Sequence, residues 1–395
     1  AHGDLTTNIA LILAKKLDRK PRELAGEIAA QLDFDRDVIE SVEIAGPGFI
    51  NFRAASGWWT QCIHRILEEG DEFGRSDAGD GQRVNIEFVS ANPTGPWNIV
   101  SARAASVGSA LARTMEAAGY RPHAEFYCND AGRQVRLFGA SVRARYAESL
   151  GLSGFAFPEE GYRGEYVTDI ARELAASPDA EPVVPAVPDV GRIQGRLPEV
   201  SGTPSSWMQL DEEESAEAFG RYALVRMIAA QRETCARFGL QFDTWFLESD
   251  LHRNDRLTPT LERLVEGGHV FEEEGATWFR STDFGDEKDR VLIRADGMPT
   301  YFLADVAYHY HKYQRGFEHA IDFWGPDHHG YIQRMQGAME ALDISRDWLE
   351  VQILQHVTFL EDGKNIEMSK RKGQFVTMDA LMNEVGADVA KYIFL

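Results

Sequence analysis

The segment Asn92–Ser101, with the sequence NPTGPWNIVS, has the residue types of an anion-binding turn. It follows a strand-like segment and precedes a helix-like one. In open parallel sheets, ligands bind at such turns, where the helix N-terminus presents unpaired N–H groups. Gly95 allows the backbone to approach closely, and Asn98 and Ser101 supply small polar donors. The alternative is an ordinary strand-to-helix turn, because Asn and Ser are also favoured helix caps.

A second candidate phosphate site is the basic loop Met368–Gly373, with the sequence MSKRKG. Three consecutive cations beside a glycine, on a loop after a strand, suit a mobile clamp on phosphate groups. The alternative is a solvated basic loop, which is the usual role of a charge run. The loop is nevertheless among the most basic short windows of a strongly acidic chain.

The segment Trp324–Gly330, WGPDHHG, has residues that could contact a nucleoside. Gly325 permits close approach, and Asp327 could accept hydrogen bonds from ribose hydroxyls. The adjacent pair His328-His329 could be read as metal ligands. Their side chains diverge, however, and no carboxylate or histidine follows at a spacing of three or four residues. We therefore predict no metal site in this protein.

Tyr301 and Asp305 are four residues apart, so on a helix they lie one above the other. An aromatic ring and a carboxylate on one face would suit a guanidinium or ammonium substrate. The alternative for Asp305 is a carboxylate favoured near a helix N-terminus by the helix dipole. We expect His309 and His311 to lie on the helix surface or behind the site rather than to bind a metal.

A parallel sheet is needed to bring these segments together, and the pattern from residue 83 onward predicts one. Val84, Ile86 and Phe88 alternate with polar residues, which indicates a strand. A helix-like segment follows and ends at Gly119, and the next strand is expected at 124–128. This unit of about 45 residues is a βαβ crossover. A second α/β half is predicted from strands and a helix at 320–324, 351–359 and 330–342.

The chain divides by pattern into three parts. Residues 1–53 form a small α/β unit, 54–82 a linker, and 83–395 the parallel-sheet domain, with an insertion at about 140–250. Within the insertion, the proline-rich stretch 177–206 is expected to be an exposed insertion or linker.

Composition limits the possible functions. Among 395 residues, 41 Lys and Arg oppose 63 Asp and Glu, for a net charge of -22. That balance argues against a protein that coats nucleic acid through its overall charge, although a local basic path stays possible. Three scattered cysteines exclude a disulfide scaffold and a zinc ribbon. Without a transmembrane-length apolar run or signal peptide, we expect a soluble, cytoplasmic protein that binds no membrane. We also expect a monomer, and a fragment trimmed at both ends.

Taken in order, these motifs and several others resemble the arginyl-tRNA synthetases, a family of class I aminoacyl-tRNA synthetases. The resemblance covers nearly the whole chain. Its residues lie at 2–10, 46–51, 87–96, 129–134, 162–166, 301–305, 325–330 and 368–371.

The resemblance implies a Rossmann-like class I catalytic domain with an insertion, preceded by a small α/β domain that contacts the tRNA elbow. It implies ligation of L-arginine to tRNA(Arg) through an arginyl-adenylate, with ATP as a substrate and Mg²⁺ accompanying it. The implied arginine-binding residues are Glu87, Ser90, Asn92, Tyr301 and Asp305. The implied ATP-binding residues are Gly95, Asn98, Ser101, Gly325, Asp327, His328, Met368 and Lys370. The implied catalytic residues are Asn98, Ser101, Ser369 and Lys370.

The sequence departs from the family pattern at both class signatures. The first, His-x-Gly-His, is here Asn98-Ile99-Val100-Ser101, and the second begins with Glu367 instead of Lys. Losing one histidine donor to phosphate can cost on the order of 3 kcal/mol. One alternative is therefore a non-catalytic or repurposed relative that binds tRNA or nucleotide, and another is a ligase acting on a different amine. The family's C-terminal anticodon-binding domain is expected to follow Leu395.

Overall fold

The computed structural model describes residues 3–355, 357, 360–361, 364–365 and 376–395. It forms two compact units, Ala1–Arg75 and Ser76–Leu395. The division falls within the stretch that the sequence suggests as a linker. The first part of that stretch is helical, as its pattern indicated, and forms α3 (Ser56–Glu69) followed by η1 (Gly70–Glu72).

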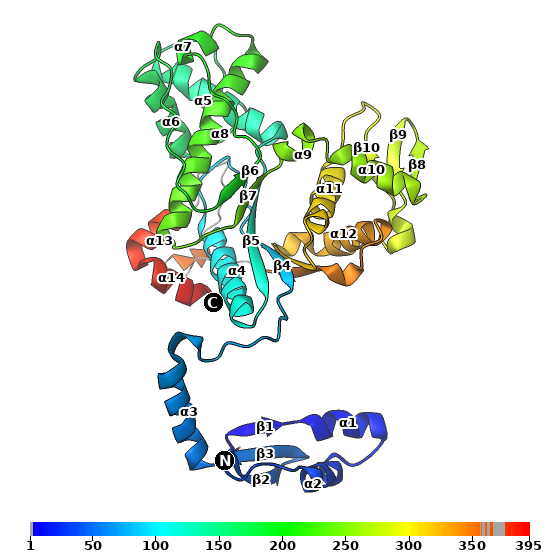
Figure 1. Cartoon of the computed structure of the whole chain (residues 1–395). Helices are drawn as coiled ribbons and strands as arrows, with labels where there is room; N and C mark the ends of the chain where they lie inside the picture. Colours follow the sequence, from blue (N-terminus) through cyan, green and yellow to red (C-terminus); the bar gives the residue numbers. More distant parts are fainter. Residues whose placement is uncertain (1–2, 356, 358–359, 362–363, 366–375) are drawn as a thin grey trace. The chain divides into compact units, whose positions relative to one another are not determined.

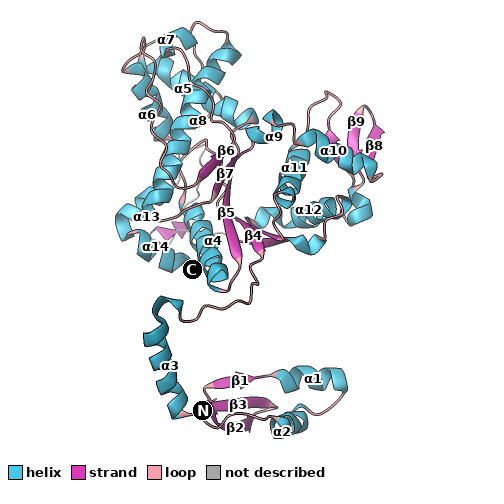
Figure 2. Ribbon diagram, in the orientation of Figure 1, coloured by secondary structure: helices cyan, strands magenta, loops and turns pink. Residues whose placement is uncertain are grey.

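The first unit contains a three-stranded antiparallel sheet in the order β1-β3-β2 (Figures 1 and 2). Its strands are β1 (Leu5–Thr7), β2 (Ile39–Ala45) and β3 (Phe49–Ala54). The helices α1 (Ile9–Leu17) and α2 (Pro21–Gln31) contribute Ala10 and Ala25 to a small core around Ile50 of β3. The hairpin turns at Gly46 and Gly48, whose φ values of 54° and 142° favour glycine. The predicted helices and hairpin are confirmed.

A six-stranded sheet lies at the centre of the second unit, and every pair of neighbouring strands in it is parallel. The strand order is β12-β11-β4-β5-β7-β6. In chain order the strands are β4 (Arg83–Glu87), β5 (Arg121–Cys128), β6 (Arg192–Gln194), β7 (Thr244–Leu247), β11 (His319–Trp324) and β12 (Leu349–Ile353). The predicted α/β fold with a parallel sheet is therefore confirmed.

The crossover between β4 and β5 is α4 (Ile99–Ala117), which packs against β5 (Figure 1). It begins at Asn98, whose side-chain oxygen accepts a hydrogen bond from the Ser101 N–H. Beneath the start of α4 lies an aromatic core, in which Trp97 stacks on Phe126 and on Trp245. Trp97 is fully buried, so the turn before α4 is anchored to the sheet.

The predicted insertion is a helical layer with a core of its own. Figure 1 shows its helices gathered beside one another above the sheet. They are α5 (Gly132–Ser149), α6 (Glu165–Ala175), α7 (Pro204–Trp207) and α8 (Glu212–Arg237). Phe138 of α5 and Phe219 of α8 are completely buried in that core. Gly139 permits close packing, because a Cβ there would lie 2.1 Å from the Ala216 carbonyl oxygen of α8.

The proline-rich stretch 177–206 is more ordered than its composition suggests. Its residues 192–194 form the edge strand β6, which pairs with β7. Buried Arg232 of α8 holds the preceding segment, since its guanidinium donates to the carbonyls of Pro188 (2.8 Å) and Gly191 (2.7 Å). The stretch lies within the predicted insertion, and tertiary hydrogen bonds give it an order that its local sequence pattern does not predict.

The second half of the unit supports the site from one side. There, α11 (Tyr301–Gln314) and α12 (His329–Ala341) lie beside the small antiparallel sheet β10-β9-β8 (Figure 2). The small sheet consists of β8 (Val270–Glu273), β9 (Ala276–Phe279) and β10 (Arg290–Ile293). The remaining elements are α9 (Ser249–Arg253), α10 (Leu257–Glu266), η2 (Ser281–Phe284), η3 (Pro326–His328), η4 (Arg346–Trp348), β13 (Leu360–Glu361), β14 (Lys364–Asn365), α13 (Met378–Val385) and α14 (Ala387–Phe394).

Candidate functional site

A cavity of about 260 Å³ opens at the carboxyl ends of β4, β5 and β11. Parallel sheets place ligand sites at this edge. Five of the sequence-predicted site residues line the cavity together: Glu87, Ser90, Asp305, Gly325 and His328. The residues predicted for a cationic substrate and some of those predicted for a nucleoside thus meet in one place. At Gly325 an added Cβ would meet open space, so this position leaves room for a ligand.

Asp305 is the carboxylate of this cavity that a ligand cation would meet. It projects from α11, and its Oδ2 accepts a 2.6 Å hydrogen bond from the Tyr331 hydroxyl of α12. Burial raises the pKa of Asp305, while the Tyr331 hydrogen bond and the nearby His309 lower it. A cationic ligand would stabilise the ionised form, because an opposite charge nearby favours a carboxylate.

Glu87, the last residue of β4, is held at both carboxylate oxygens. Its Oε1 accepts from the Ser90 hydroxyl at 2.8 Å, and its Oε2 accepts from the Lys312 ammonium at 2.6 Å. In the turn that follows Glu87, Val89 and Ser90 have left-handed φ values of 72° and 39°, respectively. A β-branched residue rarely takes that conformation, and such strain gathers at functional sites. The strained turn directs Ser90 back onto Glu87.

The charges beside the cavity can be counted from the hydrogen bonds. His309 faces two acceptors, the Asp305 carbonyl at 2.7 Å and the Asp322 carboxylate at 2.8 Å. Both ring nitrogens must therefore donate, which makes His309 an imidazolium, and Asp322 raises its pKa in opposition to burial. The positive charges of Lys312 and His309 then offset the negative charges of Glu87 and Asp322. Asp305 remains as the carboxylate without a cation among these groups.

Two residues in this cluster, Lys312 and Asp322, were missed by the sequence analysis. Lys312 follows Asp305 by seven residues, so both lie on one face of α11, and this spacing was the available signal. Asp322 lies inside an apolar strand, and an acidic residue at such a position was a second signal. Neither spacing nor composition shows that they pair.

The predicted turn Asn92–Ser101 is held from two sides. The buried Gln231 of α8 donates to the carbonyls of Asn92 (3.2 Å) and Gly95 (2.8 Å), and the Tyr166 hydroxyl of α6 donates to the Thr94 carbonyl. The helical insertion therefore fixes the backbone of the turn. Asn92 itself donates to Gln134 of α5 at 2.7 Å.

Of the two residues replacing the signature histidines, Asn98 is the more accessible. Asn98 caps α4, and its Oδ1 accepts from the Ser101 N–H at 3.1 Å and from the Ser101 hydroxyl at 3.3 Å. Ser101 is 9% exposed, whereas the intervening Val100 is 37% exposed. The segment after the basic loop docks here, since the Ile99 N–H donates to the Val376 carbonyl and Asn98 forms a bridge with Thr377. The predicted residues Met368, Ser369 and Lys370 lie outside the described residues.

Tyr301 does not line the cavity of Asp305. It is 65% exposed and lies on a neighbouring cavity of about 580 Å³. The residues that line this second cavity include Arg133, Arg136 and Arg294, together with Glu248. The i, i+4 spacing placed Tyr301 and Asp305 on one helix face correctly, but that face spans two cavities. Asp327, predicted for the ribose, is exposed in η3.

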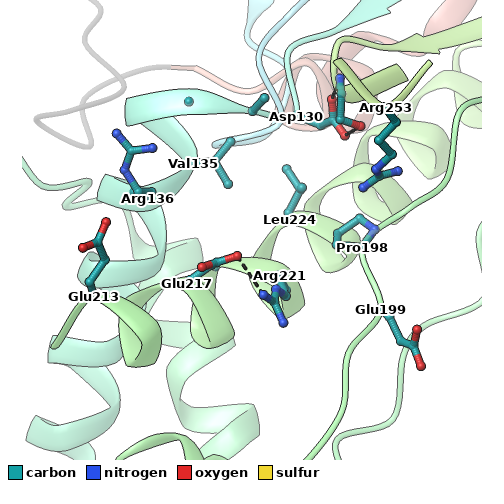
Figure 3. Close-up of a pocket in the computed structure, with 14 residues that line it drawn as sticks. Asp130, Val135, Arg136, Pro198, Glu199, Glu213, Glu217, Arg221, Leu224 and Arg253 are labelled. Carbon is teal, nitrogen blue, oxygen red and sulfur yellow. Dashed lines mark hydrogen bonds and ion pairs between the residues drawn. The ribbon is translucent and has the colours of Figure 1, made fainter. Parts of the chain in front are cut away.

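A third cavity, of about 530 Å³, lies where α5, α8 and α9 meet (Figure 3). It is larger than the cavity of Asp305, but the residues predicted to bind arginine or ATP do not line it. Its charges are mixed, because Arg136, Arg221 and Arg253 face Glu199, Glu213 and Glu217. Glu217 and Arg221 pair at 2.7 Å. The chemistry of the predicted ligands favours the cavity of Asp305.

The described residues hold no group of three or more His, Cys, Asp or Glu side chains arranged to bind a metal ion. Among the described helices, none is both long and apolar enough to cross a membrane.

Two family models match the chain. The model of the arginyl-tRNA synthetase N-terminal domain matches residues 1–54, and that of the class I (R) tRNA synthetase catalytic domain matches residues 207–393. A curated arginine–tRNA ligase from Listeria welshimeri is 44% identical over 393 residues, which cover 100% of this chain and 66% of that protein. One from Desulforamulus reducens is 42% identical with the same coverage.

Solved structures that are similar to this chain come from the same family. A crystal structure from Campylobacter jejuni, assigned as an arginyl-tRNA synthetase, has a TM-score of 0.72 and 33% identity over 85% of this chain and 67% of its own. The Thermus thermophilus arginyl-tRNA synthetase has a TM-score of 0.66 at 18% identity, which shows a common fold. The present chain thus spans 66% of the length of the curated relatives that it matches.

Proposed function

Because this chain belongs to the arginyl-tRNA synthetase family, we propose that the protein ligates L-arginine to tRNA(Arg) with ATP as co-substrate. The observation that carries the proposal is the charge of the Asp305 cavity. Lys312 and His309 balance Glu87 and Asp322, which leaves Asp305 to pair with one guanidinium. Arginine carries such a group at every accessible pH.

The proposed reaction has two steps. A carboxylate oxygen of arginine attacks the α-phosphorus of ATP, and pyrophosphate leaves with the electrons of the broken P–O bond, which yields arginyl-adenylate. A ribose hydroxyl at the 3′ end of tRNA then loses its proton and attacks the carbonyl carbon, and AMP leaves. The protein's contribution is to orient the reactants and to donate hydrogen bonds to the developing phosphate charge. Mg²⁺ enters with ATP.

We assign arginine to Glu87, Ser90 and Asp305, with Asn92 at the edge of the same turn. ATP is assigned to the backbone at Gly95 and Gly325, to Asn98, and to His328 and Asp327 of the adjoining segment. Ser101 acts through Asn98, because its hydroxyl donates to the Asn98 side chain. The basic loop with Met368, Ser369 and Lys370 completes the proposed phosphate site.

The cavity beside Tyr301 suits the 3′ end of the tRNA. Its three guanidinium groups can contact phosphates, and the exposed ring of Tyr301 can stack on a base. Arg133 pairs with Glu160, and Arg294 pairs with Asp296, but both pairs are solvent-exposed and therefore weak. These two arginines can therefore leave their carboxylate partners to contact phosphate groups.

The altered signature supports an alternative, in which the protein binds nucleotide or tRNA without catalysis. Asn98 uses its oxygen as a helix cap, and Ser101 is nearly buried, so this turn offers fewer donors than two histidines would. Val100 places a side chain where the family has glycine.

Arginine-dependent exchange of pyrophosphate into ATP, measured on the full-length protein with tRNA present, separates these functions. The proposal predicts exchange that requires arginine. Absence of exchange while ATP still binds would favour the non-catalytic alternative. Exchange with another amino acid, but not with arginine, would assign a different substrate.

A further inference from the structure

A fully buried lysine lies behind the Asp305 cavity. Lys312 of α11 is 0% exposed, and its Nζ donates to Glu87 Oε2 at 2.6 Å and to Asp322 Oδ1 at 2.8 Å. The ammonium also lies 4.6 Å from the centre of the Tyr308 ring. Burying a lysine is costly unless it is paired and hydrogen-bonded, and here two charged hydrogen bonds and one cation–π contact offset that cost.

The lysine lies against a row of carboxylates on the sheet. Glu87 of β4 is in register with Asp322 of β11 on one side and with Glu125 of β5 on the other. Like charges directly opposite on neighbouring strands repel one another. Glu125 has its own partner, because Arg315 donates to both of its carboxylate oxygens at 2.8 and 2.7 Å. Lys312 is therefore the cation that separates Glu87 from Asp322.

Two members of this row, Glu87 and Asp322, line the cavity, and Glu87 is the more accessible of them. It is 8% exposed, whereas Asp322 and Glu125 are 0% exposed. Ser90 fixes one of its carboxylate oxygens and Lys312 the other, so the direction of the carboxylate depends on both.

Resting on the proposed function, we propose that Lys312 is a positioning residue for arginine binding, which keeps the Glu87 carboxylate ionised and directed into the cavity. Burial and the neighbouring Asp322 raise the pKa of Glu87, and Lys312 opposes both effects. Without the ammonium, Glu87 and Asp322 would share a proton, as paired carboxylates do. The other ionisable groups that face Glu87, Lys312 or Asp322 are Glu125 and Tyr127 on β5, Asp305, Tyr308 and His309 on α11, and Arg315 at its end.

The test compares Lys312→Met with two double variants that restore the charge balance in different ways. Lys312→Met/Asp322→Asn keeps Glu87 as the carboxylate facing the His309 imidazolium. Lys312→Met/Glu87→Gln keeps the Asp322–His309 pair but removes the Glu87 charge. Each is assayed by arginine-dependent exchange in the full-length protein with tRNA, next to the Asp322→Asn and Glu87→Gln single variants.

We expect Lys312→Met to raise the KM for arginine about tenfold or more, with the KM for ATP changed less than about twofold. Its arginine KM should rise further as the pH falls from about 8.5 to about 6.5, where the shared proton binds, while that of the unmodified protein stays flat. Adding Asp322→Asn should return the arginine KM to within about threefold of the Asp322→Asn value. Adding Glu87→Gln should leave the KM for arginine at or above the Lys312→Met value, because the Glu87 carboxylate itself is then absent.

The positioning role would be overturned if the KM for arginine fell equally below the Lys312→Met value in both double variants, or in neither. So would a parallel loss of arginine and ATP affinity in Lys312→Met, which indicates a purely structural lysine. If Lys312→Met does not fold, the two charge-balanced double variants still decide the question between them. Failure of the proposed function is recognised separately, because the unmodified protein would then show no arginine-dependent exchange.

Discussion

At the scale of single residues, the site depends on which carboxylates are already paired. Glu87, Asp322 and Glu125 are neighbours on three strands, and each has a cation within hydrogen-bonding distance. Asp305 instead accepts from a neutral tyrosine. A ligand cation therefore gains most at Asp305, because an existing cation already offsets the charge of the others.

Tyr301 provides a test of how the two adjoining cavities divide the substrates. Tyr301→Ala should raise the KM for tRNA about tenfold or more through loss of base stacking. At saturating tRNA, the KM for arginine should stay within about twofold. Tyr301→Phe, which keeps the ring, is the matched control. If the KM for arginine rises and that for tRNA does not, Tyr301 belongs to the arginine site, as the sequence analysis predicted.

Glu248 should make stability depend on pH. Burial raises its pKa from 4.5 to about 7, in spite of a hydrogen bond from Tyr127. Because the folded-state pKa lies above the unfolded value, stability is complete below about pH 4.5 and falls as the pH rises through about 7. At about pH 8, Glu248→Gln should therefore be more stable than the unmodified protein by up to about 3 kcal/mol in the free energy of unfolding. Urea denaturation measures this difference as a higher midpoint concentration.

The same comparison at about pH 4.5 should show little difference between Glu248→Gln and the unmodified protein. Glu262→Gln, on an exposed position of α10, serves as the control and should be near neutral at both pH values. A Glu248→Gln variant that is less stable at high pH would show that the carboxylate is ionised and favourable there.

At the scale of elements, the helical insertion acts as the support of the signature turn. Gln231 of α8 and Tyr166 of α6 bind three carbonyls of that turn, so the turn depends on helices distant in sequence. One turn further along α8, Thr234 and Arg237 contact Asp379 of α13, close to the end of the basic loop. One helix thus contacts both the signature turn and α13.

Arg232 on the same helix should be necessary for order in the proline-rich segment. Arg232→Met removes two charged hydrogen bonds to carbonyls of half-buried residues, so we expect a loss of about 2–4 kcal/mol in the free energy of unfolding. Cleavage of the segment 177–206 in limited proteolysis should become faster, which mass spectrometry of the fragments would locate. Arg226→Met breaks a partly exposed pair with Glu173 and should cost less than about 1 kcal/mol. Equal effects of both changes would refute the role of Arg232.

At the scale of the whole molecule, the net charge of -22 contrasts with the cavities that the proposed substrates enter. The cavity beside Tyr301 is lined by three arginines and one glutamate, so positive charge is concentrated locally in an acidic chain. This net charge is that of a chain spanning 66% of the length of its curated relatives. Overall charge therefore gives little information about the proposed tRNA partner, and the local distribution gives more.

The sequence by itself determined the class of fold and the loops to which we assign the ligands. Alternation in β4, helical periodicity in α4 and the glycine-containing turn between them are local patterns, and they were sufficient to predict a parallel sheet with a ligand site at its carboxyl edge. Glu87, Ser90, Asp305, Gly325 and His328 were identified from such segments, and the structure brings them into one cavity.

The tertiary structure alone decided the charge balance and the division of the site. Lys312 meets Glu87 and Asp322 only because β4 and β11 pair in one register and α11 packs over them. Tyr301 faces a different cavity from Asp305 because one helix face borders two spaces. The strand β6 forms because Arg232 satisfies the carbonyls of the preceding segment. Each of these depends on contacts between segments far apart in the chain, which local residue patterns do not encode.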